Sequence, residues 1–221
     1  MTPSVFNLPI SEKPSDKPWV LLGLIAVCCV VEGALQLGDR GFIDMVRLRS
    51  VAYEYGGFWV GLLRSWEPNY SSQPYLMFLT YGFLHGGFLH LAVNMITLWS
   101  LGLAVLGRVG SRGFLLLYTA SLMGGAAGFA LLASTLAPMV GASGALFGLA
   151  GGLLAWGYLD RFTLRQALWP VVRAAGLLLI LNVVMWWALD GQLAWETHLG
   201  GFITGWVAAM IIDPRPRNIE I

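Results

Sequence analysis

The sequence predicts an all-α, polytopic membrane protein with six transmembrane helices. Of its 221 residues, 57% are hydrophobic and only 11% are charged, whereas soluble domains carry about 25% charged residues. A spanning helix needs about 20 mostly apolar residues, so six helices use roughly 120 positions and leave about 100 for loops and tails. We therefore expect one membrane domain over residues 19–213. The net charge of +1 gives no reason to expect a nucleic-acid partner.

Charged and turn-forming residues separate six apolar segments. They cover residues 19–37, 75–105, 113–137, 141–159, 167–189 and 198–212. A polar, Pro-rich tail of residues 1–18 precedes the first segment, and residues 214–221 form a C-terminal tail. The first segment contains Glu32 and has no small-residue cleavage site near its end. It is therefore expected to be a retained span and not a cleaved signal peptide.

The distribution of Lys and Arg predicts the orientation of the chain. These residues occur in both tails and in the loops after the second and fourth segments, which share one side if there are six spans. The connections 136–140 and 190–197 contain neither Lys nor Arg. Basic loops remain in the cytoplasm, so both termini are predicted to be cytoplasmic. Arginine outnumbers lysine 11 to 2, which favours a GC-rich bacterial source. The membrane is then expected to be the bacterial inner membrane.

Residues 38–74 form a long loop between the first two segments. Four arginines balance four acidic residues there, and aromatic residues are frequent. Amphipathic aromatic side chains are stable at a membrane interface. We expect a structured loop half-sunk in the outer interface; the alternative is an ordinary polar loop with scattered aromatic residues.

A few polar residues inside the segments lie at one depth. With a rise of 1.5 Å per residue from the nearest charged residue, Asn94 lies about 21 Å, His198 about 22 Å, Ser143 about 25 Å and His90 about 27 Å above the cytoplasmic border. The four fall within one helical turn near the outer face of a core about 30 Å thick. Polar groups inside spans are costly and usually functional. His85 lies above the hydrocarbon, where a loop-stabilising hydrogen bond is expected.

Glycines indicate which segments approach closely. Two segments carry glycine at every fourth position, namely Gly144, Gly148 and Gly152, and Gly201 and Gly205. Small residues at this spacing let helix backbones meet in lipid. Each series begins beside Ser143 or His198, so close contact would bring the serine hydroxyl near the histidine ring. Generic helix packing is the alternative interpretation.

The same residues suit acyl transfer. A serine is a poor nucleophile until a base accepts its proton, and His198 is the candidate base. Ser143 lies between Gly141 and Gly144 at the start of a helix, whose free N–H groups suit a developing oxyanion. His90 and Asn94 could add donors. Because no carboxylate lies credibly behind His198, we expect a Ser-His dyad without a third member.

Other site chemistries fit less well. The hydrolase elbow Gly-x-Ser-x-Gly is not met, because Ala145 follows Gly144. A zinc protease is disfavoured by the absence of His-Glu-x-x-His, and a metal site of the three histidines has no carboxylate. A transporter would need polar residues near the midplane and internal repeats. Asn182 and Glu32 look like interhelical hydrogen-bonding groups, with Gln36 beside Glu32. No metal or cofactor is expected.

At these residues the chain resembles the rhomboid family of intramembrane serine proteases. The matching motifs are His85-x4-His90-x3-Asn94, Gly141-x-Ser143-Gly144 and His198-x2-Gly201-x3-Gly205. The resemblance covers residues 19–213 and implies a six-span, rhomboid-like bundle of the basic bacterial form. It implies that Ser143 is the nucleophile and His198 the general base. It also implies an oxyanion hole of His90, Asn94 and the Ser143 backbone N–H.

The sequence departs from the family pattern at three places. Phe147 stands where the family often has a tyrosine that packs on the catalytic histidine. Leu76-Met77 replaces a common Trp-Arg pair, and Leu106 replaces a glutamate, although Arg108 remains. The last two positions usually support the loops, so the resemblance leaves the anchoring of the first loop in question.

The resemblance implies hydrolysis of a peptide bond in the transmembrane segments of other membrane proteins, near the outer interface. Its partners are then transmembrane substrates and lipid. Substrates with helix-weakening residues are favoured, and the fifth segment is the expected lateral gate. Trp186 and Trp187 lie near its outer end, where an aromatic belt fits equally well. The alternative is an inactive rhomboid-like protein that binds transmembrane clients; such proteins generally lose the serine or histidine kept here.

Overall fold

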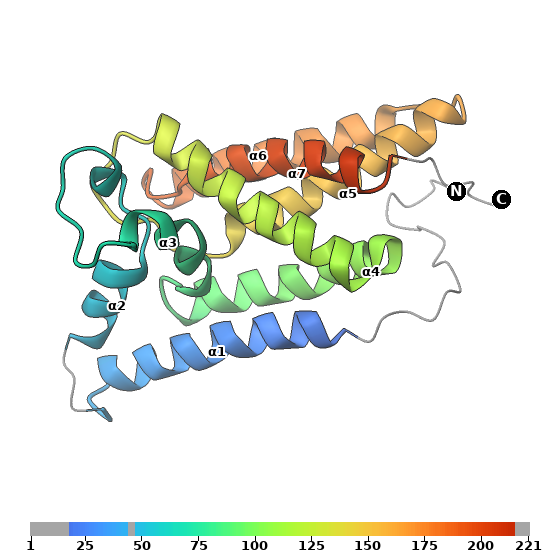
Figure 1. Cartoon of the computed structure of the whole chain (residues 1–221). Coiled ribbons are helices and arrows are strands. Elements are labelled where there is room, and N and C mark those ends of the chain that lie inside the picture. The colour runs from blue at the N-terminus through green and yellow to red at the C-terminus, as the bar shows by residue number, and fades with distance from the viewer. Residues whose placement is uncertain (1–17, 44–46, 215–221) are drawn as a thin grey trace.

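The computed structural model describes residues 18–43 and 47–214 and is helical throughout apart from loops and one isolated bridge (Figure 1). The α-helices are α1 (Trp19–Asp39), α2 (Leu48–Gly56), α3 (Gln73–Thr80), α4 (Phe88–Leu132), α5 (Ser143–Thr163), α6 (Trp169–Ala188) and α7 (Trp195–Ile212). Two short 3₁₀ helices, η1 (Val60–Leu63) and η2 (Tyr81–Phe83), complete them. The predicted all-α class is confirmed. In the described residues, α1, α4 and α6 are long and apolar enough to cross a membrane; the count of six spans stays a prediction.

The long helix α4 consists of two parts that meet at Gly110. This residue has φ 70° and ψ −179°, a backbone conformation that favours glycine. The chain turns back there, and the two parts of α4 run in opposite directions (Figure 1). One helix by hydrogen-bond pattern therefore supplies the second and third predicted segments.

The predicted start of the second segment, at Tyr75, is wrong. Residues 73–83 form α3 and η2, and α4 begins only at Phe88. Gly87 has φ 113°, which breaks the helix. Residues 75–83 are also mostly apolar, so hydropathy alone does not separate them from the helix that follows. His85 consequently lies in the connection before α4.

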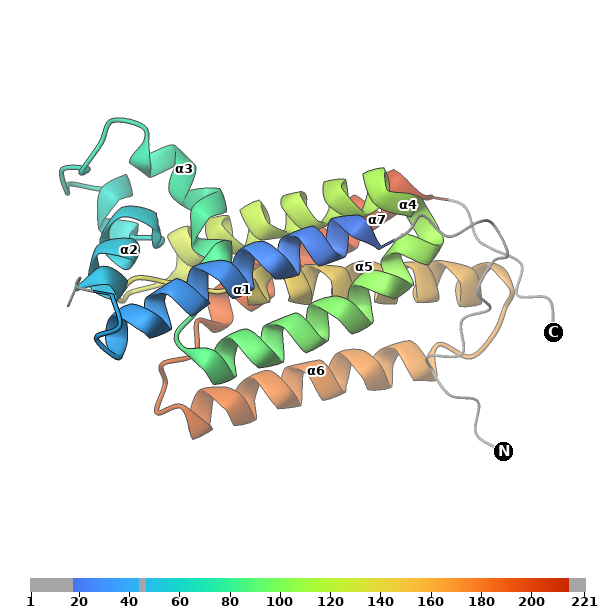
Figure 2. The same ribbon diagram turned by 90° about the horizontal axis from the view of Figure 1, so that it is seen from below.

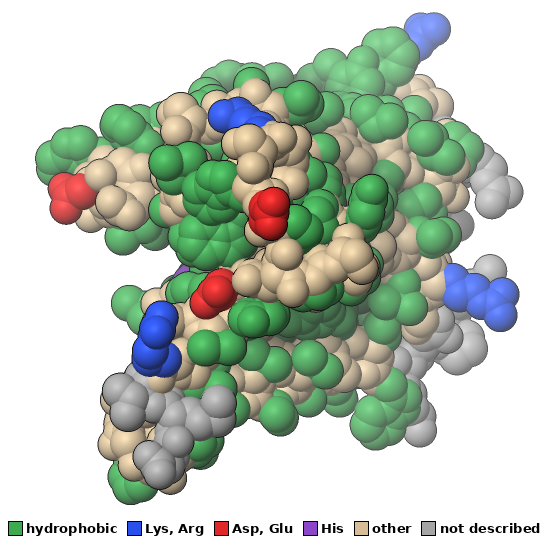
Figure 3. All heavy atoms as spheres, turned by 60° about the vertical axis from the view of Figure 1, so that its left-hand side comes forward, with side chains coloured by type: hydrophobic (Ala, Val, Ile, Leu, Met, Phe, Trp, Pro, Cys, Tyr) green, Lys and Arg blue, Asp and Glu red, His purple; other side chains and the backbone are tan. Residues whose placement is uncertain are grey.

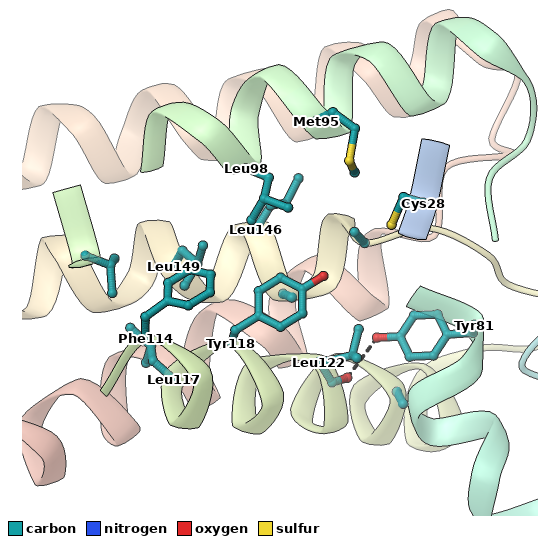
Figure 4. Packing of buried hydrophobic residues seen from close by; sticks show 14 of the residues in the cluster. Cys28, Tyr81, Met95, Leu98, Phe114, Leu117, Tyr118, Leu122, Leu146 and Leu149 are labelled. Atoms are coloured by element: carbon teal, nitrogen blue, oxygen red, sulfur yellow. Dashed lines mark hydrogen bonds between the residues drawn. The ribbon is translucent and has the colours of Figure 1, made fainter. Parts of the chain in front are cut away.

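The centre of the bundle is formed by α5, α7 and α4. In each glycine series, backbone meets backbone: a Cβ on Gly201 would overlap the carbonyl of Gly144, and one on Gly205 would overlap that of Gly148. Apolar side chains from α1, α4 and α5 fill the space beside these contacts (Figure 4). The Tyr81 hydroxyl donates to the carbonyl of Leu122 over 2.8 Å and ties η2 to this core.

Helix α6 lies at the edge of the bundle (Figure 2). Val171 is its one buried residue, and α5 is the helix that contacts α6 most, over a small area. Its side chains are almost all apolar, including those with more than half of their surface exposed. The helix is therefore held by few contacts with the rest of the protein.

The long loop is anchored by Arg49 in α2. Its guanidinium lies 2.8 Å from the carboxylate of Glu32, which is 1% exposed, and 2.7 Å from that of Asp39. It also donates to the carbonyl of His85 over 3.0 Å, as does the Tyr53 hydroxyl over 2.6 Å. The hydrogen bonds with Glu32 raise the pKa of Arg49 above the ordinary value for arginine. An arginine within the loop thus supplies an anchor to α1 and to the start of α4.

A second ion cluster closes the opposite end of the bundle. Arg108 Nη1 lies 2.7 Å from Asp160 Oδ2, and Arg108 Nε lies 3.2 Å from Asp213 Oδ2. The guanidinium also stacks over the Trp156 ring at 4.9 Å. This cluster joins α4, α5 and the end of α7. The predicted tails lie almost wholly outside the described residues.

Candidate active site

The first turn of α5 is placed by the loop that precedes it. Met139 pairs with Phe58 in the isolated bridge, and the Gly141 N–H donates to the Tyr81 carbonyl over 3.0 Å. Gly141 has φ 125°, which favours glycine. The helix then begins at Ser143 without a side-chain cap. Its first amides have no acceptor within the helix and are free for a negatively charged group.

The structure brings Ser143 and His198 together. The Ser143 Oγ lies 2.9 Å from the Nε2 of His198, although the residues are 55 positions apart. The glycine contact of Gly144 with Gly201 lies directly beside this pair and sets the short distance between α5 and α7. His198 is 5% exposed, so the hydrogen bond is shielded from competing solvent.

The Phe147 ring lies flat against the His198 ring. The ring centroids are 4.1 Å apart and the planes differ by 6°. Phe147 is one turn after Ser143 on α5, so the same helix presents the hydroxyl and the flat surface. The stack hinders rotation of the imidazole about its Cβ–Cγ bond, because that rotation would swing the ring out of its plane and into Phe147.

A third polar group contacts His198, contrary to the expectation of a dyad alone. The Oδ1 of Asn182 on α6 lies 2.8 Å from the Nδ1 of His198. The sequence predicts Asn182 only as an interhelical hydrogen-bonding group, because a carboxylate is the usual partner of a histidine that acts as a base. A depth count would have found it: Asn182 lies 17 residues after Arg165, or about 25 Å up, level with Ser143.

His90 faces the serine loop from the first turn of α4. Its Nδ1 accepts the Gly86 N–H over 3.1 Å, so the neutral ring carries its proton on Nε2. A Cβ on Gly141 would lie 2.9 Å from that Nε2, which places the ring N–H against the backbone two residues before Ser143. Asn94 is 4% exposed, and its amide donates to the His90 carbonyl over 2.8 Å within α4.

The other candidate residues lie further from the pair. His85 is fully buried with its ring 5.3 Å from that of His90, and its carbonyl receives the loop anchor. Gly205 contacts Gly148 one turn below the site. Trp186 and Trp187 lie at the end of α6 and are 45% and 77% exposed. In the described part of the chain, no three His, Cys, Asp or Glu side chains gather as a metal site would need.

The site residues fall within a region that matches a known protein family. The family model of the Rhomboid domain matches residues 72–215, about two thirds of the chain. RHOMBOID-like protein 4 of Arabidopsis thaliana is 36% identical over 140 residues, which cover 63% of this chain and 34% of that protein. Rhomboid protease GluP of Bacillus subtilis (strain 168) is 36% identical over 127 residues, covering 57% and 24%.

A third relative is Rhomboid protein 1, mitochondrial, of Saccharomyces cerevisiae. It is 34% identical over 155 residues, which cover 62% of this chain and 43% of that protein. The chain therefore spans less than half the length of each of these relatives. The match includes the loop before α4, the start of α5 and α7, where the described geometry brings the polar groups together. The chain belongs to the rhomboid family.

Proposed function

We propose that this protein is an intramembrane serine endopeptidase that cleaves transmembrane segments of other membrane proteins near the outer interface. The observation that carries the proposal is the 2.9 Å distance between Ser143 Oγ and His198 Nε2 at the first residue of a helix. Family membership supports it, since one relative is itself named a rhomboid protease.

The proposed reaction has two halves. His198 Nε2 accepts the hydroxyl proton while Ser143 Oγ forms a bond to the substrate carbonyl carbon. The C–N bond then breaks, and His198 returns the proton to the leaving amine. In the second half, His198 deprotonates a water molecule that attacks the acyl carbon. The bond between that carbon and Ser143 Oγ then breaks, and His198 returns the proton to Ser143.

The negative charge on the carbonyl oxygen needs donors fixed in place. The uncapped N-terminus of α5 offers the backbone N–H of Ser143, and the Nε2–H of His90 faces the same loop. Asn94 joins them in our proposal once its amide turns from the His90 carbonyl. Fixed donors of this kind stabilise the transition state more than the ground state.

The proposed substrate class follows from the depth of the pair. A carbonyl in an intact helix is already hydrogen-bonded, so the substrate must unwind before Ser143 reaches it. Gly, Ser and Pro weaken helices and should mark the cleaved region. The loosely held α6, with Trp186 and Trp187 at its outer end, is the proposed side of access. The loop end of the molecule carries many hydrophobic and few charged side chains, and a histidine shows beside an indentation there (Figure 3).

We propose the same membrane arrangement that the sequence predicts. Residues 19–213 would form one six-span domain in a bacterial inner membrane, with both termini cytoplasmic and residues 38–74 at the outer interface. The Arg49 and Arg108 clusters then mark the outer and cytoplasmic ends of the bundle.

A fluorophosphonate probe tests the proposal without a known substrate, because it reacts with activated serines. Intact mass is measured for the purified wild type, Ser143→Ala, His198→Ala and Ser100→Ala, the last altering an exposed serine of α4. We expect one adduct on the wild type and on Ser100→Ala, and none on the other two variants. A folded wild type that stays unlabelled in lipid would favour a non-catalytic rhomboid-like protein that binds transmembrane clients.

A further inference from the structure

Both ring nitrogens of His198 have partners, one on each side. Nε2 lies 2.9 Å from Ser143 Oγ, and Nδ1 lies 2.8 Å from Asn182 Oδ1. An amide oxygen can only accept a hydrogen bond, so this pairing assigns the ring proton to Nδ1. Nε2 is then left with the lone pair that must accept the Ser143 proton. The Asn182 contact therefore favours the one neutral form of the ring that works as a general base.

Asn182 is a polar residue in an apolar helix, so its side chain needs a hydrogen-bond partner on another helix. Its neighbours Leu181 and Val183 are 51% and 58% exposed, and the helix around them is apolar. An amide in such a helix is costly in a membrane. Packing does not explain it, because the buried residue of α6 is Val171, far along the helix. What the amide does contact is His198.

We propose that Asn182 is a positioning residue that holds His198 in the Nδ1-protonated form, so that the site operates as a Ser-His-Asn triad. Phe147 stacks on one face of the ring and forms no hydrogen bond with either ring nitrogen. The Asn182 oxygen supplies the hydrogen-bond acceptor that fixes Nδ1 at the ring edge. The inference rests on the proposed function of Ser143 and His198 and adds the third member that the dyad lacks.

The neutral amide also sets how the site responds to pH. Asn182 orients Nδ1–H without stabilising the doubly protonated ring as a carboxylate would. Among the described residues, His90 on α4 is the titratable group that acts electrostatically on His198. Glu196 lies two residues earlier in α7 and forms no hydrogen bond or ion pair with the ring in this described part of the chain. The neighbours from α5 and α6 are Ser143, Phe147 and Asn182, none of which carries a charge. An aspartate at 182 would place a negative charge against Nδ1 and keep the ring protonated to higher pH.

Labelling kinetics test the proposal. The fluorophosphonate inactivation rate constant and half-saturating probe concentration are measured against pH for wild type, Asn182→Leu, Asn182→Asp and the control Val183→Leu. Asn182→Leu should lose about 10- to 100-fold in the rate constant, as for a lost hydrogen bond to a reacting group, with half-saturation little changed. Asn182→Asp should keep the alkaline rate and shift the acidic limb upward by about one pH unit or more. Val183→Leu should match the wild type.

Nitrogen NMR gives a readout that does not depend on activity. The chain has three histidines, so ¹⁵N-histidine labelling gives few ring signals, and His198→Ala identifies those of His198. We expect a protonated Nδ1 and unprotonated Nε2 in wild type, and a shift toward the Nε2–H form in Asn182→Leu.

Three results would overturn the inference: an Nε2–H form in wild type, an unchanged rate in Asn182→Leu, or equal losses in the Leu and Asp variants with the same pH profile, which would indicate packing alone. Failure of the proposed function is distinct, since wild type would then resist the probe while the NMR result would still report on Asn182.

Discussion

Replacing Gly201 by alanine tests how closely the proposed catalysis depends on the contact between α5 and α7. A Cβ at this position would overlap the backbone carbonyl of Gly144, which no side-chain motion can relieve. Real Cβ atoms essentially never approach within 3.0 Å of another heavy atom, so the two helices must separate by about 1 Å.

That separation acts directly on the Ser143 and His198 pair, because Gly144 directly follows Ser143 and Gly201 lies one helical turn after His198. If it all falls between the helices, the Ser143 to His198 distance of 2.9 Å grows to about 4 Å, beyond hydrogen-bond range. A misplacement of about 1 Å costs roughly 100-fold in rate, or about 2.7 kcal/mol in activation free energy. Overpacking should also cost about 1–3 kcal/mol of stability.

The assay is the fluorophosphonate labelling rate together with thermal unfolding in detergent. Gly23→Ala is the matched control, since the same change in exposed α1 meets nothing within 4 Å. It should label at the wild-type rate and unfold no earlier than wild type. Wild-type labelling by Gly201→Ala, or an equal loss in Gly23→Ala, would refute the reasoning.

Four further outcomes are expected. Arg108→Ala should lower the free energy of unfolding by about 3–5 kcal/mol, because two mostly buried carboxylates lose their shared cation; an unchanged melting temperature would contradict this. Burial and the neighbouring His90 lower the pKa of His85 to about 4 from 6.5, so the unfolded state binds a proton first as pH falls. Stability should be unaffected above pH 7.5 and fall by about 2 kcal/mol at pH 5, a dependence that His85→Gln should reduce in melts across pH. Asn94→Ala should lower the labelling rate only partly, as one of several oxyanion donors, and a full wild-type rate would remove it from the site. EDTA should leave labelling unchanged; loss that zinc restores would indicate a metal site.

Much of the fold could be predicted because hydropathy reports burial in lipid, segment by segment. The same signal could not find the break before α4, since residues on both sides of it are apolar. The adjacent glycines Gly86 and Gly87 are the sign of this break in the sequence. They interrupt the apolar segment because Gly87 has a positive φ, which the sequence alone does not reveal. The pairing of Arg49 with Glu32, 17 positions apart, depends on how the loop folds back, which no periodicity encodes.

For the site, depth and glycine spacing together predicted that Ser143 and His198 lie at one level on closely packed helices. The structure agrees with that expectation, since Ser143 Oγ lies 2.9 Å from His198 Nε2. The contact of Asn182 was not predicted for a chemical reason: the usual partner of a basic histidine is a carboxylate, and a neutral amide in an apolar run is typical of ordinary helix packing. A count of depth treats both groups alike and finds it.

The sparse packing of α6 has a consequence for how this sequence can change. A helix with one buried residue places few demands on side-chain shape, so most of its positions should accept any apolar residue in a saturation mutagenesis screen. The glycine positions where α5 and α7 meet should accept almost no substitution. Within the tolerant helix, position 182 should stand out as an isolated site of constraint. The pattern of permitted substitutions would then mark α6 as the part of the protein that is free to adapt to new lipids and, under the proposed function, to new substrates.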